Sequence, residues 1–179
     1  KLYLINAGSV TAAGVLQPWG PAITTDIAGP LQYGDGANGN LNGCAAFPAG
    51  SLAGKVLLVD RGVCAISIKG ANGSAAGAVA VLVANNRFSN TPPTFSYGGG
   101  AVTAPTLSIT QNDGNSLKTV LGQTATIGPN DFIALQDDIV ASSSRGPRIA
   151  DGAIKPDISA PGASVSAEVG TGSGKTAFG

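Results

Sequence analysis

Residues 52–64 have the sequence LAGKVLLVDRGVC, and this stretch decides the fold. Its central run, KVLLVD over residues 55–60, begins after Gly54 and ends at Arg61-Gly62. Leucine and valine follow one another there without alternating with polar residues, a pattern typical of a strand buried on both faces. We therefore expect a sheet whose two faces are both covered.

The next segment, residues 64–77, is predicted to be a helix that packs on this sheet. Apolar residues recur at helical spacing and would form one stripe of small side chains against the sheet. The stripe consists of Ile68, Ala71 and Ala75. Gly70 and Gly73 weaken the prediction, because a glycine inside a helix costs about 1 kcal/mol relative to Ala. Residues 78–84, AVAVLVA, predict a second buried strand.

Shorter elements complete the predicted fold. Residues 1–43 contain short apolar runs separated by Gly, Pro and Asn, which indicate strands joined by turns. Residues 104–109 and 124–127 predict further strands, and residues 139–141 are expected to end another one. With only two short helices among several strands, the pattern predicts an α+β fold that is mainly β.

The second helix is predicted over residues 111–121. Thr110 precedes it as a candidate N-cap, and Asp113 lies in the first turn, where a carboxylate is favourable. Gly122 follows as a candidate stop.

The composition is that of a folded, loop-rich domain. Of the 179 residues, 43% are hydrophobic and 11% are charged, with 27 Gly and 11 Pro. Ten Lys plus Arg balance ten Asp plus Glu without a basic run, so no nucleic acid or anionic membrane is predicted as a partner. The longest small apolar run, residues 75–84, is far shorter than the roughly 20 residues of a membrane-spanning helix. Because the chain starts at Lys1 without a signal-peptide pattern, it is interpreted as an excised piece of a longer protein.

Histidine is absent from the sequence. This removes the commonest general base and any Ser-His-Asp triad, so no catalytic residue is predicted in this chain. A Ser/Lys hydrolase is the enzymatic alternative, in which Lys155 or Lys175 would activate a hydroxyl among residues 142–144.

No cofactor or metal site is predicted either. The run GSGKT at residues 172–176 lacks the earlier glycine of a phosphate-binding loop, because Val169 stands at that position. The carboxylates of Asp137, Asp138 and Asp151 are interpreted as solvated loop charges rather than calcium ligands.

Several short motifs follow one another in the middle of the chain. They are Gly43-Cys44, residues 52–64, Lys69, residues 75–81, residues 104–109 and Asp113-Gly114. In this order they resemble the core of protease-associated (PA) domains. Ile66 departs from that family, which often has an aromatic residue there. The resemblance implies a β-barrel-like or sandwich module with two short flanking helices, and residues 1–130 are assigned to it.

A sharper motif lies further along the chain. It consists of Ser143, Ser144, Arg145, Gly146 and Pro147, followed by Lys155, Pro156, Asp157, Ala160, Pro161 and Gly162. These residues are similar to the segment that subtilisin-like serine peptidases (subtilases) place shortly before the Gly-Thr-Ser motif of their nucleophile. The resemblance assigns residues 131–179 to a returning segment of the catalytic domain that ends just before that motif.

Together the two resemblances imply a non-catalytic PA domain of a secreted, subtilisin-like serine endopeptidase. Such a domain would bind a protein or peptide substrate, control access to the active site, or support a homodimer. Its partners would be the substrate, the rest of the catalytic domain or a second copy, and any calcium would belong to the parent enzyme. The alternative is a structural spacer that stabilises the parent peptidase.

Two candidate sites flank the end of the central strand. Cys44 and Cys64 either form a disulfide or remain two buried thiols, and the secreted location that the resemblance implies favours the disulfide. A bridge closing a loop of this length would stabilise the fold by about 3 kcal/mol. Asp60, Arg61 and Gly62 are a candidate interaction loop, and the competing interpretation is a structural turn in which Arg61 pairs locally.

Overall fold

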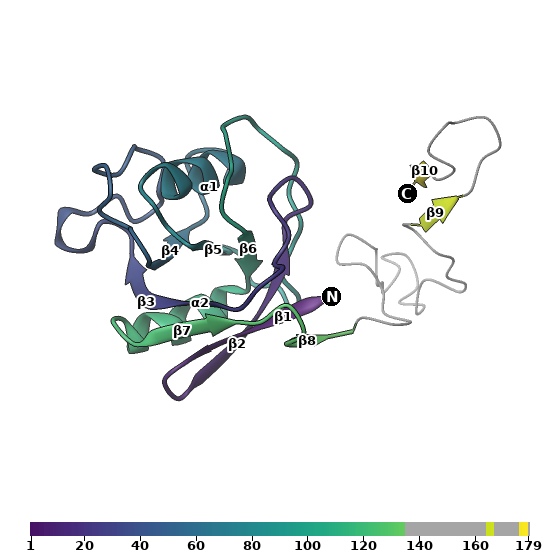
Figure 1. The fold of residues 1–179 in the computed structure, drawn as a ribbon, viewed down its shortest axis with the longest axis horizontal. Helices are drawn as coiled ribbons and strands as arrows, with labels where there is room; N and C mark the ends of the chain where they lie inside the picture. Colours follow the sequence, from purple (N-terminus) through teal and green to yellow (C-terminus); the bar gives the residue numbers. More distant parts are fainter. Residues whose placement is uncertain (135–163, 167–175, 179) are drawn as a thin grey trace, which may run out of the picture. The chain divides into compact units, whose positions relative to one another are not determined.

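The computed structural model describes residues 1–134, Ser164–Ser166 and Thr176–Phe178 (Figure 1). Two short strands, β9 (Ser164–Ser166) and β10 (Thr176–Phe178), pair with each other in antiparallel fashion. The predicted strand end at residues 139–141 and the subtilase-like motif between residues 143 and 162 lie outside the described residues. The division into residues 1–130 and 131–179 therefore stays a prediction.

Seven strands pair in a closed ring. The pairing runs from β1 to β2, β6, β5, β4, β3 and β7, and then returns to β1. Strands β3, β4, β5 and β6 are parallel to one another, and the remaining pairs are antiparallel. The strands are β1 (Leu2–Ala7), β2 (Val10–Leu16), β3 (Ile27–Tyr33), β4 (Val56–Asp60), β5 (Ala80–Ala84), β6 (Thr106–Ile109) and β7 (Thr124–Ile127). The ring confirms the prediction of an α+β fold that is mainly β.

Smaller elements extend this barrel. A short strand, β8 (Phe132–Ile133), pairs with the first residues of β1. A single 3-10 turn, η1 (Gly36–Asn38), lies in the loop between β3 and β4. No helix in the described part of the chain is long and apolar enough to cross a membrane.

The central strand β4 is buried on both faces, as the sequence predicted. Val56 and Leu58 belong to a core that fills the barrel, whereas Leu57 and Val59 belong to a second core outside it. The division arises because successive side chains of a strand point to opposite faces. All four side chains are 0% exposed, so each face of β4 contributes fully to a hydrophobic core.

The helix α1 (Ile66–Ala75) accompanies β4 and β5 on the same side of the barrel in Figure 1. Its buried residues include Lys69, Gly70 and Gly73, whereas Ala75 is exposed. The predicted stripe of Ile68, Ala71 and Ala75 is therefore wrong, because the helix turns its glycine face to the sheet. A Cβ on Gly73 would lie 2.8 Å from side-chain atoms of Leu57 and Val81, so the close approach requires glycine.

The second helix, α2 (Gln111–Leu117), continues as a 3-10 turn, η2 (Lys118–Val120). Thr110 is its N-cap, as predicted, because the Thr110 hydroxyl accepts a hydrogen bond from the Asp113 N–H at 3.1 Å. Gly122 follows with φ of +83°, a left-handed conformation that ends the helical segment at little steric cost. Leu117 is fully buried in the barrel core.

Candidate functional site: the groove beside the Arg61 turn

The chain turns sharply where β4 ends, over residues 60–63. Gly62 has φ of +133° and Val63 has φ of +68°. Positive φ is unfavourable for a β-branched residue, because its Cβ crowds the following carbonyl oxygen at a cost of about 1–2 kcal/mol. Val63 is also 90% exposed, so burial of its side chain does not offset the strain. Contacts around the turn must hold it in place.

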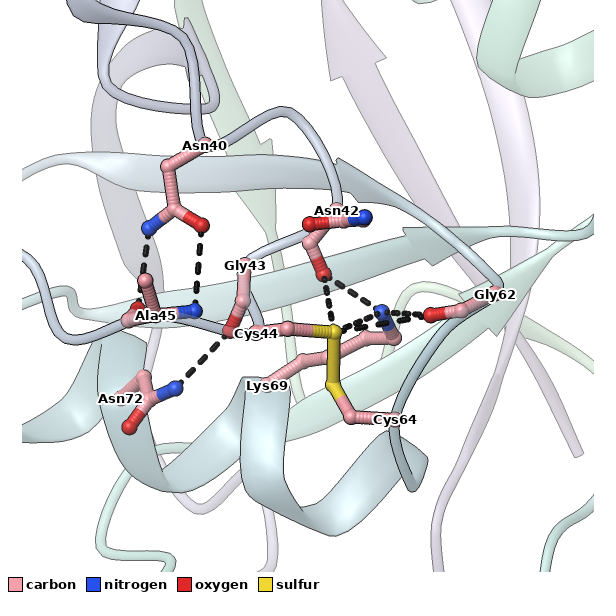
Figure 2. The surroundings of a disulfide bond; sticks show 9 residues. All are labelled: Asn40, Asn42, Gly43, Cys44, Ala45, Gly62, Cys64, Lys69 and Asn72. Atoms are coloured by element: carbon pink, nitrogen blue, oxygen red, sulfur yellow. Dashed lines mark hydrogen bonds between the residues drawn. A yellow bond between two sulfur atoms is a disulfide. The ribbon is translucent and has the colours of Figure 1, made fainter.

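The first of these contacts is the disulfide between Cys44 and Cys64 (Figure 2). This bridge was predicted, and its Cα atoms lie 5.8 Å apart. Lys69 reaches the same place from α1, and its Nζ donates to the Gly62 carbonyl at 2.8 Å and to the Asn42 carbonyl. The Nζ also lies 3.3 Å from Cys44 Sγ. One lysine therefore connects the helix to the turn and to the loop that carries Cys44.

Lys69 is a fully buried cation, with a side chain that is 0% exposed. Burial lowers the pKa of its ammonium group from 10.5 to about 8, and the negative charge of Asp60 acts in the opposite direction. The three N–H donors meet three acceptors, the carbonyls of Asn42 and Gly62 and the Cys44 sulfur. A buried charge is tolerated only when its hydrogen bonds are made, so Lys69 favours the conformation that supplies these acceptors.

The loop that carries Cys44 is itself well connected (Figure 2). The Asn40 side chain forms two hydrogen bonds with the Ala45 backbone, at 2.9 Å to its carbonyl and 3.2 Å from its N–H. Asn72 of α1 donates its side-chain amide to the Gly43 carbonyl at 2.9 Å. The disulfide thus joins the Arg61 turn to a loop that α1 already holds.

The Asp60 side chain makes its hydrogen bonds outside this network and connects β4 to β3 and η2. Its carboxylate accepts a hydrogen bond from the Tyr33 hydroxyl of β3 and forms an ion pair with Lys118 of η2, whose Nζ lies 2.7 Å from Asp60 Oδ1. Burial and the hydrogen bond to Asp60 raise the pKa of Tyr33. Burial lowers the pKa of Lys118, but the hydrogen bonds to Asp60 and Tyr33 outweigh it and the pKa is raised. These contacts give Asp60 a structural role.

Arg61 lies on the other side of the turn, against the loop between β5 and β6. Its Nη1 donates to Asn85 Oδ1 at 2.8 Å, and its guanidinium carbon lies 4.7 Å from the centre of the Phe95 ring. Such stacking and hydrogen bonding orient a guanidinium but leave its charge unneutralised. Among the residues that the structure describes, the ion pair found joins Lys118 to Asp60, so Arg61 has no carboxylate partner there.

A groove of about 300 Å³ lies beside this turn. Its lining residues are Arg61, Gly62, Val63, Cys64, Ala65, Ile66, Phe95 and Ser96. Trp19 holds Phe95 in position at the groove, because its indole Nε1 donates to the Phe95 carbonyl at 2.8 Å. The lining combines one cation and the Ser96 hydroxyl with apolar side chains, and it offers no carboxylate, imidazole or free thiol. Such a groove can bind an apolar and acidic segment, but these lining groups include no proton acceptor suited to general-base catalysis.

A second hollow, of about 480 Å³, lies between residues 21–28 and residues 103–105, with Ala78 and Val79 completing its lining. Asp26 is the ionisable side chain in that lining. Without a strained turn or a highly exposed apolar side chain at its edge, this hollow is the weaker candidate.

Of the predicted interaction loop, Arg61 and Gly62 line the groove. Asp60 does not line it and instead forms the ion pair with Lys118. Sequence reasoning missed Phe95 and Asn85, which lie in the loop between β5 and β6, more than twenty residues after Arg61. It also gave no role to Lys69. A lysine on the sheet-facing side of the helix was the available signal, but the helix was predicted in another orientation.

The comparisons with known proteins agree with this fold. Residues 27–117 match the PA domain family, and the chain therefore belongs to that family. Over 132 residues it is 34% identical to Minor extracellular protease Vpr of Bacillus subtilis (strain 168). The match covers 70% of this chain but 15% of that protein, so the chain spans a small part of the relative's length.

Solved structures show the same fold. BSAP, a zinc aminopeptidase from Bacillus subtilis, superposes with a TM-score of 0.57 at 24% identity, covering 70% of this chain and 29% of that one. A medium-resolution structure of BSAP gives a TM-score of 0.56 at 23% identity, again covering 70% of this chain and 29% of that one. The same fold thus occurs in a zinc aminopeptidase, and the fold alone does not define the reaction of the parent.

Proposed function

We propose that this chain is the non-catalytic PA domain of a secreted, subtilisin-like serine endopeptidase, and that it binds protein substrate at the Arg61 groove. Membership of the PA family and the relationship to an extracellular protease support this role. The disulfide fits an oxidising, extracellular location. The subtilase-like residues between 143 and 162 support residues 131–179 as the returning segment of the catalytic domain.

The observation that carries the binding role is Val63. A β-branched side chain that is 90% exposed at φ of +68° is unfavourable in two ways at once. Strained residues of this kind cluster at binding and catalytic sites, where the surrounding structure maintains them for function. The disulfide and Lys69 supply that maintenance here, and they do so directly beside the groove.

The chemistry of the groove defines the segment that it would bind. Arg61 offers a guanidinium without a carboxylate partner among the described residues, and it suits an acidic side chain or a terminal carboxylate. Val63, Ile66 and Phe95 offer apolar surface beside it. The preferred ligand is therefore an unfolded stretch of substrate that carries a carboxylate next to an aliphatic or aromatic side chain.

Binding of casein to the 179-residue chain tests this proposal, because casein is an unfolded, acidic protein substrate. Arg61→Gln should weaken binding about tenfold, the effect of losing one charged hydrogen-bonded contact. Arg87→Gln is the matched control, since Arg87 is an exposed arginine outside the groove lining. Equal affinity of the wild-type protein and Arg61→Gln for casein would mean that casein does not bind at this groove.

Two further experiments separate the alternatives. The purified chain should not hydrolyse a fluorogenic peptide, since it has no histidine to activate a serine. Turnover that a serine-directed phosphonate inhibits would instead support a Ser/Lys hydrolase. If the domain were a structural spacer, groove variants of the parent protease would keep full activity on protein substrates, and deleting the domain would lower only stability.

A further inference from the structure

The two sulfurs of the disulfide have different electrostatic surroundings. The Lys69 ammonium lies 3.3 Å from Cys44 Sγ, and Figure 2 shows the amino group beside that sulfur rather than beside Cys64. Cys64 instead contributes to the lining of the open groove. Cys44 Sγ is thus next to a buried positive charge, while Cys64 is one of the residues that line an open groove.

We propose that the Cys44–Cys64 bridge is a thiol-exchange site with a fixed direction, in which an external thiolate attacks Cys64 from the groove and Cys44 leaves as the thiolate. This inference does not depend on the proposed binding of substrate. It rests on the placement of Lys69 and on the groove lining.

The exchange needs no oxidant or reductant other than the external thiol. The thiolate of a small thiol forms a new S–S bond with Cys64 Sγ, and the electron pair of the broken bond stays on Cys44 Sγ. A dithiol completes the reaction, because its second thiolate displaces Cys64 and the reagent leaves as a cyclic disulfide. Two electrons pass from the dithiol to the protein, and both cysteines end reduced.

Lys69 favours Cys44 as the leaving group for an electrostatic reason. A neighbouring ammonium stabilises a thiolate and lowers its pKa, and a disulfide opens faster when the departing thiol has a low pKa. The ammonium needs no rearrangement, because the carbonyls of Asn42 and Gly62 already hold it. With a pKa of about 8 despite its burial, it is still mostly protonated at neutral pH. The Asp60 carboxylate helps to keep this charge.

The first product of the exchange would occupy the groove. A substituent attached to Cys64 lies among the residues that line it, with Arg61 and Phe95 nearby. The modification would therefore fill the groove, and release of Cys44 would remove the covalent link between its loop and the Arg61 turn.

Mapping the adduct tests the direction of attack without any substitution. The folded 179-residue chain is exposed briefly to glutathione, the free thiols are trapped with N-ethylmaleimide, and the peptides are identified by mass spectrometry. We expect glutathione on Cys64 and maleimide on Cys44 in at least about nine of ten adducts, the tenfold preference that such a charge provides. Equal distribution, or glutathione mainly on Cys44, would overturn the proposal.

The rate of reduction by dithiothreitol tests the role of the charge. Lys69→Met retains most of the side-chain length but removes the ammonium, and it should slow reduction about tenfold at neutral pH. Lys55→Met is the matched control, because Lys55 precedes β4 at the end opposite the Arg61 turn and contacts Gln32. A Lys69→Met protein that is reduced as fast as the control overturns the proposal. If Lys69→Met does not fold, the adduct map on the wild-type chain still decides the question.

Discussion

Strand β4 and the turn that follows it differ sharply, although they are only a few residues apart. Residues 56–59 are 0% exposed and fill two hydrophobic cores, whereas Val63 is 90% exposed with φ of +68°. Burial of the strand stabilises the folded state, whereas strain in the turn destabilises it. The difference indicates that the strand stabilises the domain and that the turn is kept in an unfavourable conformation, which we propose serves binding.

The largest expected effect is on the strand side of this comparison. Leu58→Ala should lower the free energy of unfolding by about 2–5 kcal/mol, because it removes a fully buried side chain and leaves a cavity in the barrel. Denaturant unfolding measures it. The 43% exposed Leu121 provides the control, and Leu121→Ala should cost less than about 1 kcal/mol. Similar losses for both variants would contradict the assignment of Leu58 to the barrel core.

The second prediction concerns the contact between α1 and the strands. Gly73→Ala should destabilise the protein by about 1–3 kcal/mol, because the new Cβ would lie 2.8 Å from Leu57 and Val81 side-chain atoms. Helix propensity alone predicts the opposite sign, a gain of about 1 kcal/mol. Ala75→Gly at the exposed end of α1 is the control, and its loss should be smaller. A stabilised Gly73→Ala protein would show that α1 does not lie so close to the sheet.

The third prediction is a pH dependence due to Lys69. Its pKa is about 8 in the folded protein and near 10.5 when exposed, so between these values the unfolded chain binds more protons. Stability due to this group should therefore rise as the pH increases from 8 toward 10, by at most about 1.4 kcal/mol for each pH unit. Lys69→Met should lack this rise when both proteins are unfolded in urea across that range. Parallel curves for the two proteins would contradict the lowered pKa.

The smallest effect is expected at the strained turn itself. Val63→Gly removes strain of about 1–2 kcal/mol but adds about 0.5–1 kcal/mol of backbone entropy to the unfolded chain. The variant should therefore gain about 0.5–1 kcal/mol in thermal or urea unfolding. It should also bind casein more weakly, since it loses apolar surface at the groove. A clear loss of stability would mean that the Val63 conformation is not strained.

Much of the barrel could be predicted from the sequence, because local patterns carry the information. Uninterrupted Val and Leu runs gave both buried parallel strands, and Thr110 with Asp113 gave the start of α2. The face of α1 was mispredicted, because apolar spacing was weighed above close packing. The helix approaches the sheet closely at Gly70 and Gly73, whose missing side chains leave no hydrophobic signal.

The candidate site was predicted only in part. Arg61 and the cysteine pair stood out as residues, but the groove needs Phe95 from a distant loop and the positive φ of Val63. Neither feature has a local sequence pattern, because both arise from tertiary contacts with the disulfide, Lys69 and Trp19. The buried position of Lys69 depends likewise on the orientation of α1.

The most direct test of the proposed function is a comparison of kcat/KM for two substrates in the parent protease. Arg61→Gln should lower kcat/KM for casein about tenfold, because the groove would bind a part of this long substrate that is remote from the cleaved bond. The same substitution should leave kcat/KM for a short chromogenic peptide unchanged, since such a peptide would not reach the groove. Equal losses on both substrates, or no loss on casein, would contradict a substrate-binding role for this domain.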